Sequence, residues 1–320
     1  MLSRLQIWIQ SRIQYGLMLL RGLRLPGFEE MTVLDVLVFF FRGLLDPRFT
    51  LMASAMSYQF FFSLFPTLLL LFILLPLVPV PGLQEDIVAF IGQVVPSDGV
   101  DFIERLVEAQ FSRSADLALA LVSVLLALWG GLRGIIAMIK AFSRRDEVFK
   151  RRNLFQLYRV ALGVFVSLGV TLVLAVLFIS LIDNILHWFV LHQVFNEDVR
   201  TSMYRVGRFL ITSGGIFLMI SLIYYLAPPV RRRWPFVSAG TLVATGLTLL
   251  ANAGLNYYFV NFAQYDKIYG SLGAIILLMV WFYYISIVLL IGFELNAAIY
   301  LASWHDQRLQ EQEENAESPA

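Results

Sequence analysis

The chain has 320 residues, of which 59% are hydrophobic and 15% charged, and its formal net charge is +1. Ordinary soluble domains carry about 25% charged residues, and the apolar residues here form long uncharged blocks, so the composition indicates a polytopic membrane protein. The absence of Cys excludes disulfides, thiolate metal sites and a Cys nucleophile, and the near-neutral charge provides no general attraction for nucleic acid.

Three parts are expected along the chain: a cytoplasmic N-terminal segment, a transmembrane domain and an acidic, disordered cytoplasmic tail. Their bounds are 1–48, 49–303 and 304–320. Within the first part, Met31 to Leu45 is too short to cross a membrane and contains Asp35 and Arg42. This stretch predicts an amphipathic helix that lies at the membrane interface.

Six stretches almost free of charged residues are long enough to cross a hydrocarbon core about 30 Å thick. They are Met52 to Val80, Leu117 to Ile139 (interrupted by Arg133), Val160 to Ile182, Phe209 to Leu226, Phe236 to Phe259 and Ile268 to Phe293. The sequence therefore predicts an all-α fold, a polytopic membrane helical bundle of six transmembrane helices with interfacial amphipathic helices.

The Lys and Arg residues predict the orientation of these spans, because basic loops stay in the cytoplasm. Eighteen of the 24 flank the ends that would share one side with the N-terminus, and six lie on the other side. Both termini are therefore expected on the cytoplasmic side of the membrane. The connections Pro81 to Asp116 and Asp183 to Arg208 become external loops, of which the first is acidic and is expected to form short helices at the membrane surface.

Polar residues open the first predicted span. Ser57, Tyr58 and Gln59 precede Pro66, which lacks an N–H group and is expected to kink the helix. A kink beside polar side chains predicts a polar cavity. The alternative is that the small residues of this span pack against a neighbouring helix.

The fifth predicted span carries a second polar group. Thr248, Asn252 and Asn256 recur at four-residue spacing and share one helix face. In hydrocarbon such a face must turn into the bundle. There it either bridges helices or contacts a polar passenger, and both readings remain open.

Charges are also predicted at the inner mouth of the bundle. Arg133 comes about 24 Å after the external end of its span, and Glu294 about 36 Å after the start of the sixth span at Gly270. Both residues are therefore expected near the cytoplasmic boundary of the membrane. This common depth suggests that Arg133 and Glu294 pair or flank one polar site, with Asn296 as a further candidate. The alternative is that Arg133 extends to phosphate headgroups of the membrane.

Glycines predict close approaches of the backbone at two places. Gly130 and Gly134 allow a neighbouring helix to approach the region around Arg133. Tyr269, Gly270 and Gly273 suggest a tight external turn before the sixth span, with a structural role.

Motifs for catalysis are not found in the sequence. The three His residues do not form a metal-ligand pattern, and Walker A, G-x-S-x-G and dinucleotide-type glycine loops are absent. We therefore expect no enzyme activity, metal or cofactor. The expected partners are membrane lipids, whose anionic headgroups would contact the cytoplasmic basic loops, and not nucleic acid.

Four short runs lie in order along the chain. They are Ala53-Ser54-Ala55-Met56-Ser57-Tyr58 leading to Phe62-Ser63-Leu64-Phe65-Pro66, Arg133-Gly134 before a basic loop, Tyr269-Gly270-Ser271-Leu272-Gly273, and Gly292-Phe293-Glu294-Leu295-Asn296. Together they resemble the YihY/virulence factor BrkB family over roughly residues 35–300. Ser143 and Ala227-Pro228-Pro229 depart from the family pattern and put local loop contacts in doubt.

This resemblance implies a six-span bacterial inner-membrane protein. Some relatives carry the label ribonuclease BN, which this chain does not fit because a metal-dependent nuclease needs clustered His and Asp ligands. Other relatives are linked to virulence or envelope integrity. We favour a transporter, or a facilitator that translocates a lipid or solute, and the alternative is a scaffold that binds an envelope partner through its cytoplasmic loop and tail.

Overall fold

The protein is seen in a computed structural model that describes residues 33–74, 117–143, 152–191, 197–230, 234–262 and 271–317. The regular elements of these residues are helices. They are α2 (Val33–Leu44), α3 (Arg48–Leu74), α6 (Leu117–Ala141), α7 (Leu154–Leu191), α8 (Glu197–Leu226), α9 (Ala239–Phe262) and α11 (Ser271–Glu317). The predicted all-α class is confirmed for the part of the chain that is described.

Each predicted span corresponds to one of the helices from α3 to α11. Among the described residues, four stretches are long and apolar enough to cross a membrane, and α9 contributes a shorter apolar one, Ala239–Gly254. The four are Val124–Ala141, Leu154–Phe189, Asp198–Leu226 and Leu278–Trp304. The chain thus contains several membrane-length apolar helices, and the number six stays a prediction.

Local sequence signals explain where three of the helices begin. Asp46 accepts a hydrogen bond from the Arg48 backbone N–H at 2.9 Å and so caps α3. The Gln156 side chain accepts one from the backbone N–H of Asn153 at 3.3 Å, which is half of a capping box at the start of α7. Ser238 caps α9, because its Oγ accepts a hydrogen bond from the Thr241 N–H at 3.2 Å.

Two helices are longer than the sequence predicts. α7 runs to Leu191 and α8 begins at Glu197, so most of the expected loop from Asp183 to Arg208 is helical. The sequence prediction bounds these two spans by the charged residues Asp183 and Arg208. A helix continues through charged residues, because Asp and Arg near a helix end reach water or headgroups without breaking the backbone hydrogen bonds.

The polar tail also differs from its expectation. α11 continues past the sixth span to Glu317, whereas the sequence predicts a fraying helix end and then disorder after Trp304. Gln, Glu, Leu and Arg have high helix propensity, and a helix that is already formed extends without the cost of a new nucleus. The expected surface helices of Pro81 to Asp116 lie outside the described residues.

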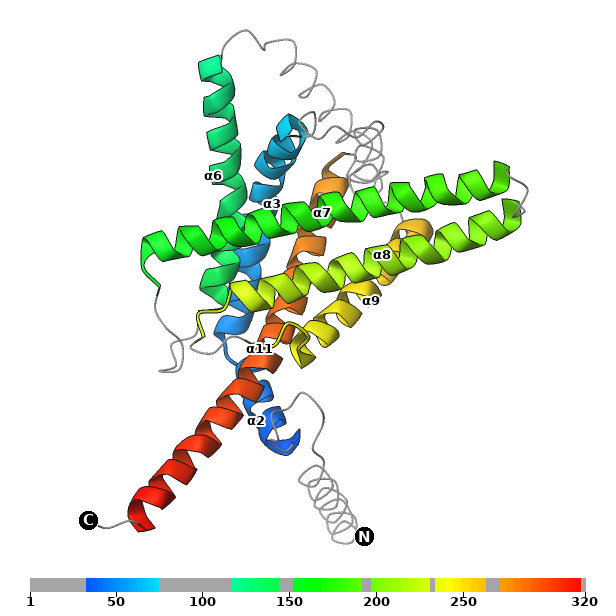
Figure 1. Cartoon of the computed structure of the whole chain (residues 1–320). Helices are drawn as coiled ribbons and strands as arrows, with labels where there is room; N and C mark the ends of the chain where they lie inside the picture. The colour runs from blue at the N-terminus through cyan, green and yellow to red at the C-terminus, as the bar shows by residue number, and fades with distance from the viewer. Residues whose placement is uncertain are drawn as a thin grey trace.

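The helices form two groups that cross (Figure 1). α3, α6 and α11 run side by side, and α7 and α8 form a long antiparallel pair that crosses them at a large angle. α9 connects the groups because it packs on both α8 and α11. α2 packs on α11 as well, where Val36 is fully buried against Ala298 and Ala302.

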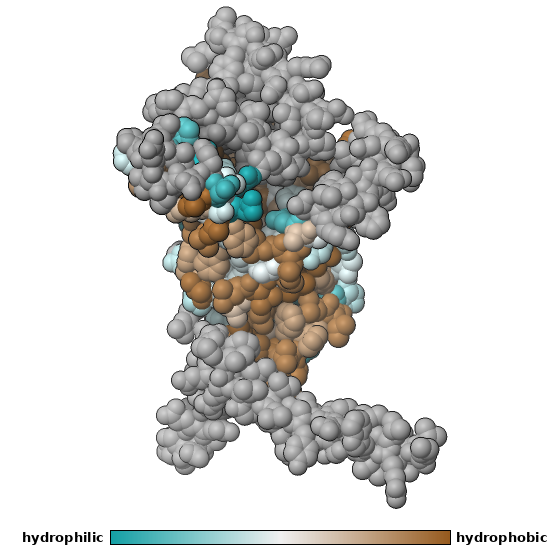
Figure 2. Space-filling model, turned by 90° about the vertical axis from the view of Figure 1, so that its right-hand side faces the viewer, coloured by the Kyte–Doolittle hydropathy of each residue, from teal (hydrophilic) through white to brown (hydrophobic). Residues whose placement is uncertain are grey.

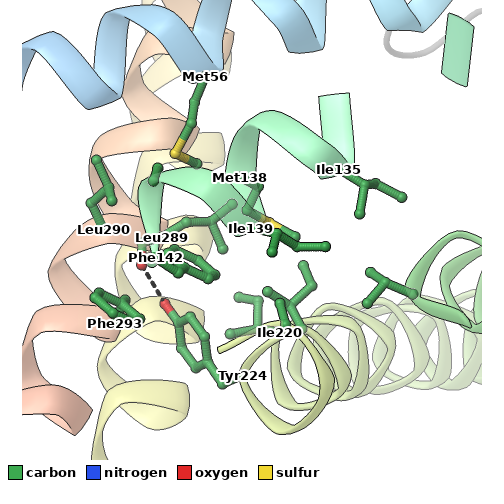
Figure 3. Packing of buried hydrophobic residues seen from close by; sticks show 14 of the residues in the cluster. Met56, Ile135, Met138, Ile139, Phe142, Ile220, Tyr224, Leu289, Leu290 and Phe293 are labelled. Atoms are coloured by element: carbon green, nitrogen blue, oxygen red, sulfur yellow. Dashed lines mark hydrogen bonds between the residues drawn. The ribbon is translucent and has the colours of Figure 1, made fainter. Parts of the chain in front are cut away.

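The core lies where these groups meet (Figure 3). Phe142, directly after α6, stacks on Phe293 of α11 with 4.5 Å between ring centroids and 2° between ring planes. Such aromatic pairs contribute about 0.5–1.5 kcal/mol beyond their buried area. Met56 of α3 and Ile220 of α8 belong to the same cluster, so residues from both groups share one core.

The outer surface is apolar over long stretches, as Figure 2 shows for the described part of one side. The exposed large apolar residues of α7 include Phe155, Leu162, Val166, Val170, Leu174, Phe178, Leu181 and Ile185. A contiguous apolar face of this length is too large for a soluble monomer and is typical of a surface that contacts lipid.

Candidate functional site

A buried polar cluster surrounds the start of α9. The Asn296 side chain of α11 accepts a hydrogen bond from the Gly240 N–H at 2.8 Å and donates one to Ser238 Oγ at 2.9 Å. Ser238 Oγ also lies 2.8 Å from Thr241 Oγ1. Thr241 is fully buried and Asn296 is 4% exposed. The cluster therefore satisfies free backbone and side-chain groups at a helix N-terminus that is remote from water.

Glycine permits this close contact between α9 and α11. A Cβ at Gly240 would meet the Gly292 carbonyl oxygen and would lie 2.6 Å from Cγ of Asn296. A Cβ at Gly292 would meet the Tyr224 hydroxyl and would lie 2.8 Å from the Ala244 Cβ. Both distances are too short for a real side chain, so this crossing requires glycine on both helices.

α8 contacts the same cluster through Tyr224. Its hydroxyl donates a hydrogen bond to the Leu289 carbonyl at 2.8 Å, and the residue is 1% exposed (Figure 3). One turn earlier, the Ser221 hydroxyl donates to the Phe236 carbonyl at 2.8 Å. These two bonds join α8 to α11 and to the segment that leads into α9.

An arginine holds the other side of this region. Arg152 precedes α7, and its guanidinium donates to the carbonyls of Ala227 at 2.5 Å and Pro228 at 2.9 Å. These carbonyls follow the C-terminus of α8, where backbone acceptors lack helical partners and the helix dipole favours a cation. The contact connects the start of α7 to the turn between α8 and α9.

One face of α9 is polar from the buried cluster outward. Thr241, Thr245, Thr248 and Asn252 follow one another at spacings of four, three and four residues, which places them on one side of the helix. Thr241 is fully buried, Thr245 is 9% exposed, Thr248 is half-buried and Asn252 is exposed. We call these four residues the α9 polar stripe. Its exposure rises with distance from the cluster.

Contacts along the α9 polar stripe are sparse. The Thr248 hydroxyl donates to the Ala244 carbonyl of its own helix at 2.8 Å, and Trp281 Nε1 of α11 lies 3.5 Å from Asn252 Oδ1. The buried Thr245 Oγ1 has no hydrogen-bond partner in the described part of the chain. The stripe therefore retains hydrogen-bonding capacity.

The three polar residues and the proline predicted as a site in the first span have different surroundings. The Ser57 hydroxyl donates to the Met279 carbonyl of α11 at 3.3 Å, and Pro66 lies in the contact with Gly130 of α6. Tyr58 is 53% exposed, and Gln59 is half-buried. Ser57 and Pro66 match the packing alternative, and a shared cavity of the first and fifth spans stays a prediction.

The predicted inner-mouth charges have different surroundings. Arg133 is exposed, and its guanidinium carbon lies 4.8 Å from the centroid of the Trp129 ring. Glu294 is 7% exposed. Their pairing stays a prediction, whereas Asn296 lies in the polar cluster described above.

The remaining predicted residues are only partly covered. Asn256 lies on α9 and Gly273 on α11, but their surroundings are outside the described set. Tyr269 and Gly270 lie outside the described residues, and so does the predicted turn before the sixth span. Within the described ranges, His, Asp and Glu form no group of three or more that suits a metal ion.

Several residues of this region are not predicted as site residues from the sequence. They are Arg152, Ser221, Tyr224, Ser238, Gly240, Thr241, Thr245 and Gly292. A Ser three residues before a Thr at the start of an apolar helix is a detectable capping signal. Ser221 bonds to a carbonyl 15 positions away, and the contacts of Gly240, Tyr224 and Arg152 join residues more than 50 positions apart, so local pattern does not reveal them.

One known protein family matches most of this chain. The profile of the family described as Virulence factor BrkB matches residues 40–317. The chain belongs to the virulence factor BrkB family. No solved structure matches this chain.

Several relatives of this BrkB family chain are similar over most of their length. The ribonuclease-like protein YfkH of Bacillus subtilis is 24% identical over 248 residues, which cover 78% of this chain and 89% of that protein. A UPF0761 membrane protein of Tolumonas auensis is 26% identical, over 84% of this chain and 86% of its own. One from Pseudoalteromonas atlantica is 24% identical, over 85% and 89%. The names of the relatives and the apolar helices identify a membrane protein. The relatives' names do not agree on a catalytic function.

Proposed function

We propose that this BrkB family protein is a transporter, or a facilitator that translocates a lipid or small solute, in the bacterial inner membrane. In this proposal six helices span the bilayer and both termini are cytoplasmic. The observation that carries it is the α9 polar stripe, which runs from Thr241 to Asn252 beside α11.

The position of the α9 polar stripe supports a passage. Hydroxyl and amide groups that face lipid tails lose hydrogen bonds to water without replacement, so they are expected to face protein, water or a polar passenger. Thr245 Oγ1 has no hydrogen-bond partner among the described residues, and Trp281 Nε1 makes a long contact of 3.5 Å with Asn252 Oδ1. A polar solute or lipid headgroup that moves along the α9 polar stripe would find hydrogen-bond partners there.

The dimensions of the stripe suit one half of a passage. The twelve residues from Thr241 to Asn252 span about 16 Å, or half of a hydrocarbon core about 30 Å thick. The stripe is exposed at Asn252 and closed at Thr241, where Asn296 and Ser238 fill the space beside it. A polar line that is exposed at one end and buried at the other suits a gated transporter in one of its states.

The test is translocation by the purified protein in vesicles of phosphatidylcholine and phosphatidylglycerol. One assay follows chemical bleaching of a fluorescent phospholipid, and the other follows swelling in a small neutral solute. We expect one of them to exceed protein-free vesicles, and Thr245→Val and Asn252→Leu to slow it several-fold.

Ser303→Ala is the matched control, because the Ser303 hydroxyl donates a hydrogen bond to the Tyr300 carbonyl of its own helix at 3.1 Å and lies away from the α9 polar stripe. Folded protein in each vesicle preparation is quantified by size-exclusion chromatography before reconstitution. Activity in neither assay, or losses that only follow the amount of folded protein, would refute the passage and favour a packing role for the stripe.

A scaffold function is the second candidate, and one observation favours it. α11 extends to Glu317 and projects away from the other described helices (Figure 1). A projecting helix offers a surface to a cytoplasmic partner. Deletion of residues 305–317 would then abolish the cellular function while Thr245→Val and Asn252→Leu are tolerated, which is the reverse of the result expected for a transporter.

A further inference from the structure

The outward face of α6 changes from apolar to basic along its length. Val122 and Leu126 are 51% and 62% exposed, and Trp129 is 53% exposed. Arg133 and Lys140 follow on the same face, and both are exposed. Spacings of four, three, four and seven residues keep all five side chains on one side of the helix.

The opposite face of α6 is held in place by close contacts. A Cβ at Gly130 would lie 2.5 Å from Cγ of Pro66, and one at Gly134 would meet the Ser63 hydroxyl of α3. A Cβ at Gly131 would lie 2.9 Å from the Phe165 ring of α7. Rotation of α6 would replace these glycines with bulkier residues, so Arg133 is held on the outside of the bundle.

An arginine on the outer surface of a membrane helix requires an anionic or aqueous partner. Arg133 comes sixteen residues after Leu117, about 24 Å along α6, and nine residues after Val124, where the membrane-length stretch Val124–Ala141 begins. Its charge therefore lies within the membrane-length part of the helix, and its long side chain has to reach a headgroup or water. Trp129, one turn earlier, is a residue type enriched at headgroup depth. Its ring lies 4.8 Å from the guanidinium carbon of Arg133, a cation–π contact that orients the charge.

We propose that Trp129, Arg133 and Lys140 form a headgroup site for an anionic phospholipid. Arg133 donates to the phosphate oxygens as a planar fork, Lys140 adds a positive charge two turns further along, and the acyl chains lie against Val122 and Leu126. Charge complementarity and the adjoining apolar surface select a lipid rather than a soluble anion. The site does not depend on the proposed translocation.

The buried Glu294 is the competing partner for Arg133. It lies on α11 with 7% exposure, whereas Arg133 is exposed and sits over Trp129. An exposed guanidinium on the outside of α6 is better placed for a headgroup than for a carboxylate within the bundle. The lipid test below therefore also separates these two assignments.

Quenching of Trp129 fluorescence by brominated lipid tests the site. The signal of Trp129 is the difference between the full-length protein and its Trp129→Phe variant, because the chain has six Trp residues. In phosphatidylcholine vesicles, we expect brominated phosphatidylglycerol to quench this signal at least twofold more than brominated phosphatidylcholine at the same mole fraction. Equal quenching by the two lipids would overturn the proposal.

Variants and free phosphate complete the experiment. The excess quenching should disappear when Arg133→Gln is combined with Lys140→Gln, and should survive in Arg133→Lys, which keeps the charge. Arg205→Gln on α8 is the matched control, because Arg205 is also exposed but lies on another helix. Excess that survives in the double Gln variant, or that is lost equally in the control, refutes the site. Loss of the excess on adding millimolar inorganic phosphate to both sides would identify a soluble anion instead and also refute it.

Discussion

The side-chain amide of Asn296 on α11 holds the first turn of α9 through the backbone N–H of Gly240, 2.8 Å from Asn296 Oδ1. The N–H groups at a helix N-terminus have no acceptor within their own helix. Here the acceptor comes from a helix whose residue lies 56 positions further along the chain. The same amide donates to Ser238 Oγ, so one side chain connects the end of the α9 polar stripe to α11.

Replacement of this amide should weaken the bundle. Asn296→Leu keeps the approximate volume but leaves the Gly240 N–H and the Ser238 hydroxyl with fewer partners, and we expect a loss of about 1–3 kcal/mol of unfolding free energy. Thermal or denaturant unfolding in detergent micelles measures it. Ser303→Ala is the control, and a loss as large in that variant would contradict the special role of Asn296.

Substitution of glycine should separate close contacts from open surface. Gly240→Ala forces a Cβ against Gly292 and Asn296, and Gly130→Ala forces one against Pro66. Each should lower stability by about 1–3 kcal/mol. Gly246 is the matched control on α9, because nothing lies within 4 Å of its added Cβ, and alanine there should be neutral or stabilising by about 0.5–1 kcal/mol. Equal melting temperatures for all three variants would contradict the packing.

Loss of the Arg152 contacts should loosen the turn after α8. Arg152→Gln removes the cation that bonds the carbonyls of Ala227 and Pro228, and bonds to charged groups contribute about 1.5–3 kcal/mol each in protein interiors. We expect faster hydrogen exchange at the end of α8 and in the turn that follows. Arg152→Lys keeps the positive charge but loses the planar, two-pronged guanidinium donor, so we expect an intermediate rate of hydrogen exchange. Unchanged hydrogen exchange in both variants would contradict this role of Arg152.

A charge swap tests the predicted pair of Arg133 and Glu294. If the two side chains pair, Arg133→Glu combined with Glu294→Arg should recover the stability lost in each single variant. We expect no recovery, because the swap moves an arginine into a buried position and a carboxylate to a face proposed to bind anionic lipid. A double variant that is more stable than both single variants would restore the pairing.

Cysteine labelling tests the orientation in the membrane. The chain contains no Cys, so single Cys variants have no background. Ser143 follows α6 and Ser202 lies near the start of α8, and both are exposed. In intact spheroplasts, an impermeant maleimide should label Ser202→Cys, and it should label Ser143→Cys only after the membrane is permeabilised. Labelling of both from the same side would contradict the predicted topology.

Much of the architecture was predictable from local sequence. Uncharged blocks in the sequence predict the helices α3, α6, α7, α8, α9 and α11. The amphipathic pattern of Met31 to Leu45 predicts α2. The extents were less accurate for α7, α8 and the end of α11, because the absence of charge marks the lipid-embedded part of a helix and not where its hydrogen bonding stops.

The candidate site was less predictable. Asn252 and Thr248 were recognised because polar residues within an apolar block are rare. The same rule also selected Ser57, which instead contacts the Met279 carbonyl of α11. Thr241 and Thr245 extend the α9 polar stripe to the cluster, yet a Thr is common in membrane helices and bonds readily to its own backbone, so its type alone carries no signal.

The order of apolar blocks and basic connections determined by itself that this protein is helical and belongs in a membrane, because the free energy of placing a segment in lipid is a sum over its own residues. Tertiary structure alone decided that Asn296 meets Gly240, that Gly240 opposes Gly292 and that Arg133 lies outside the bundle. Those relations depend on how helices distant in the chain cross, and a contact between two surfaces is not a property of either segment.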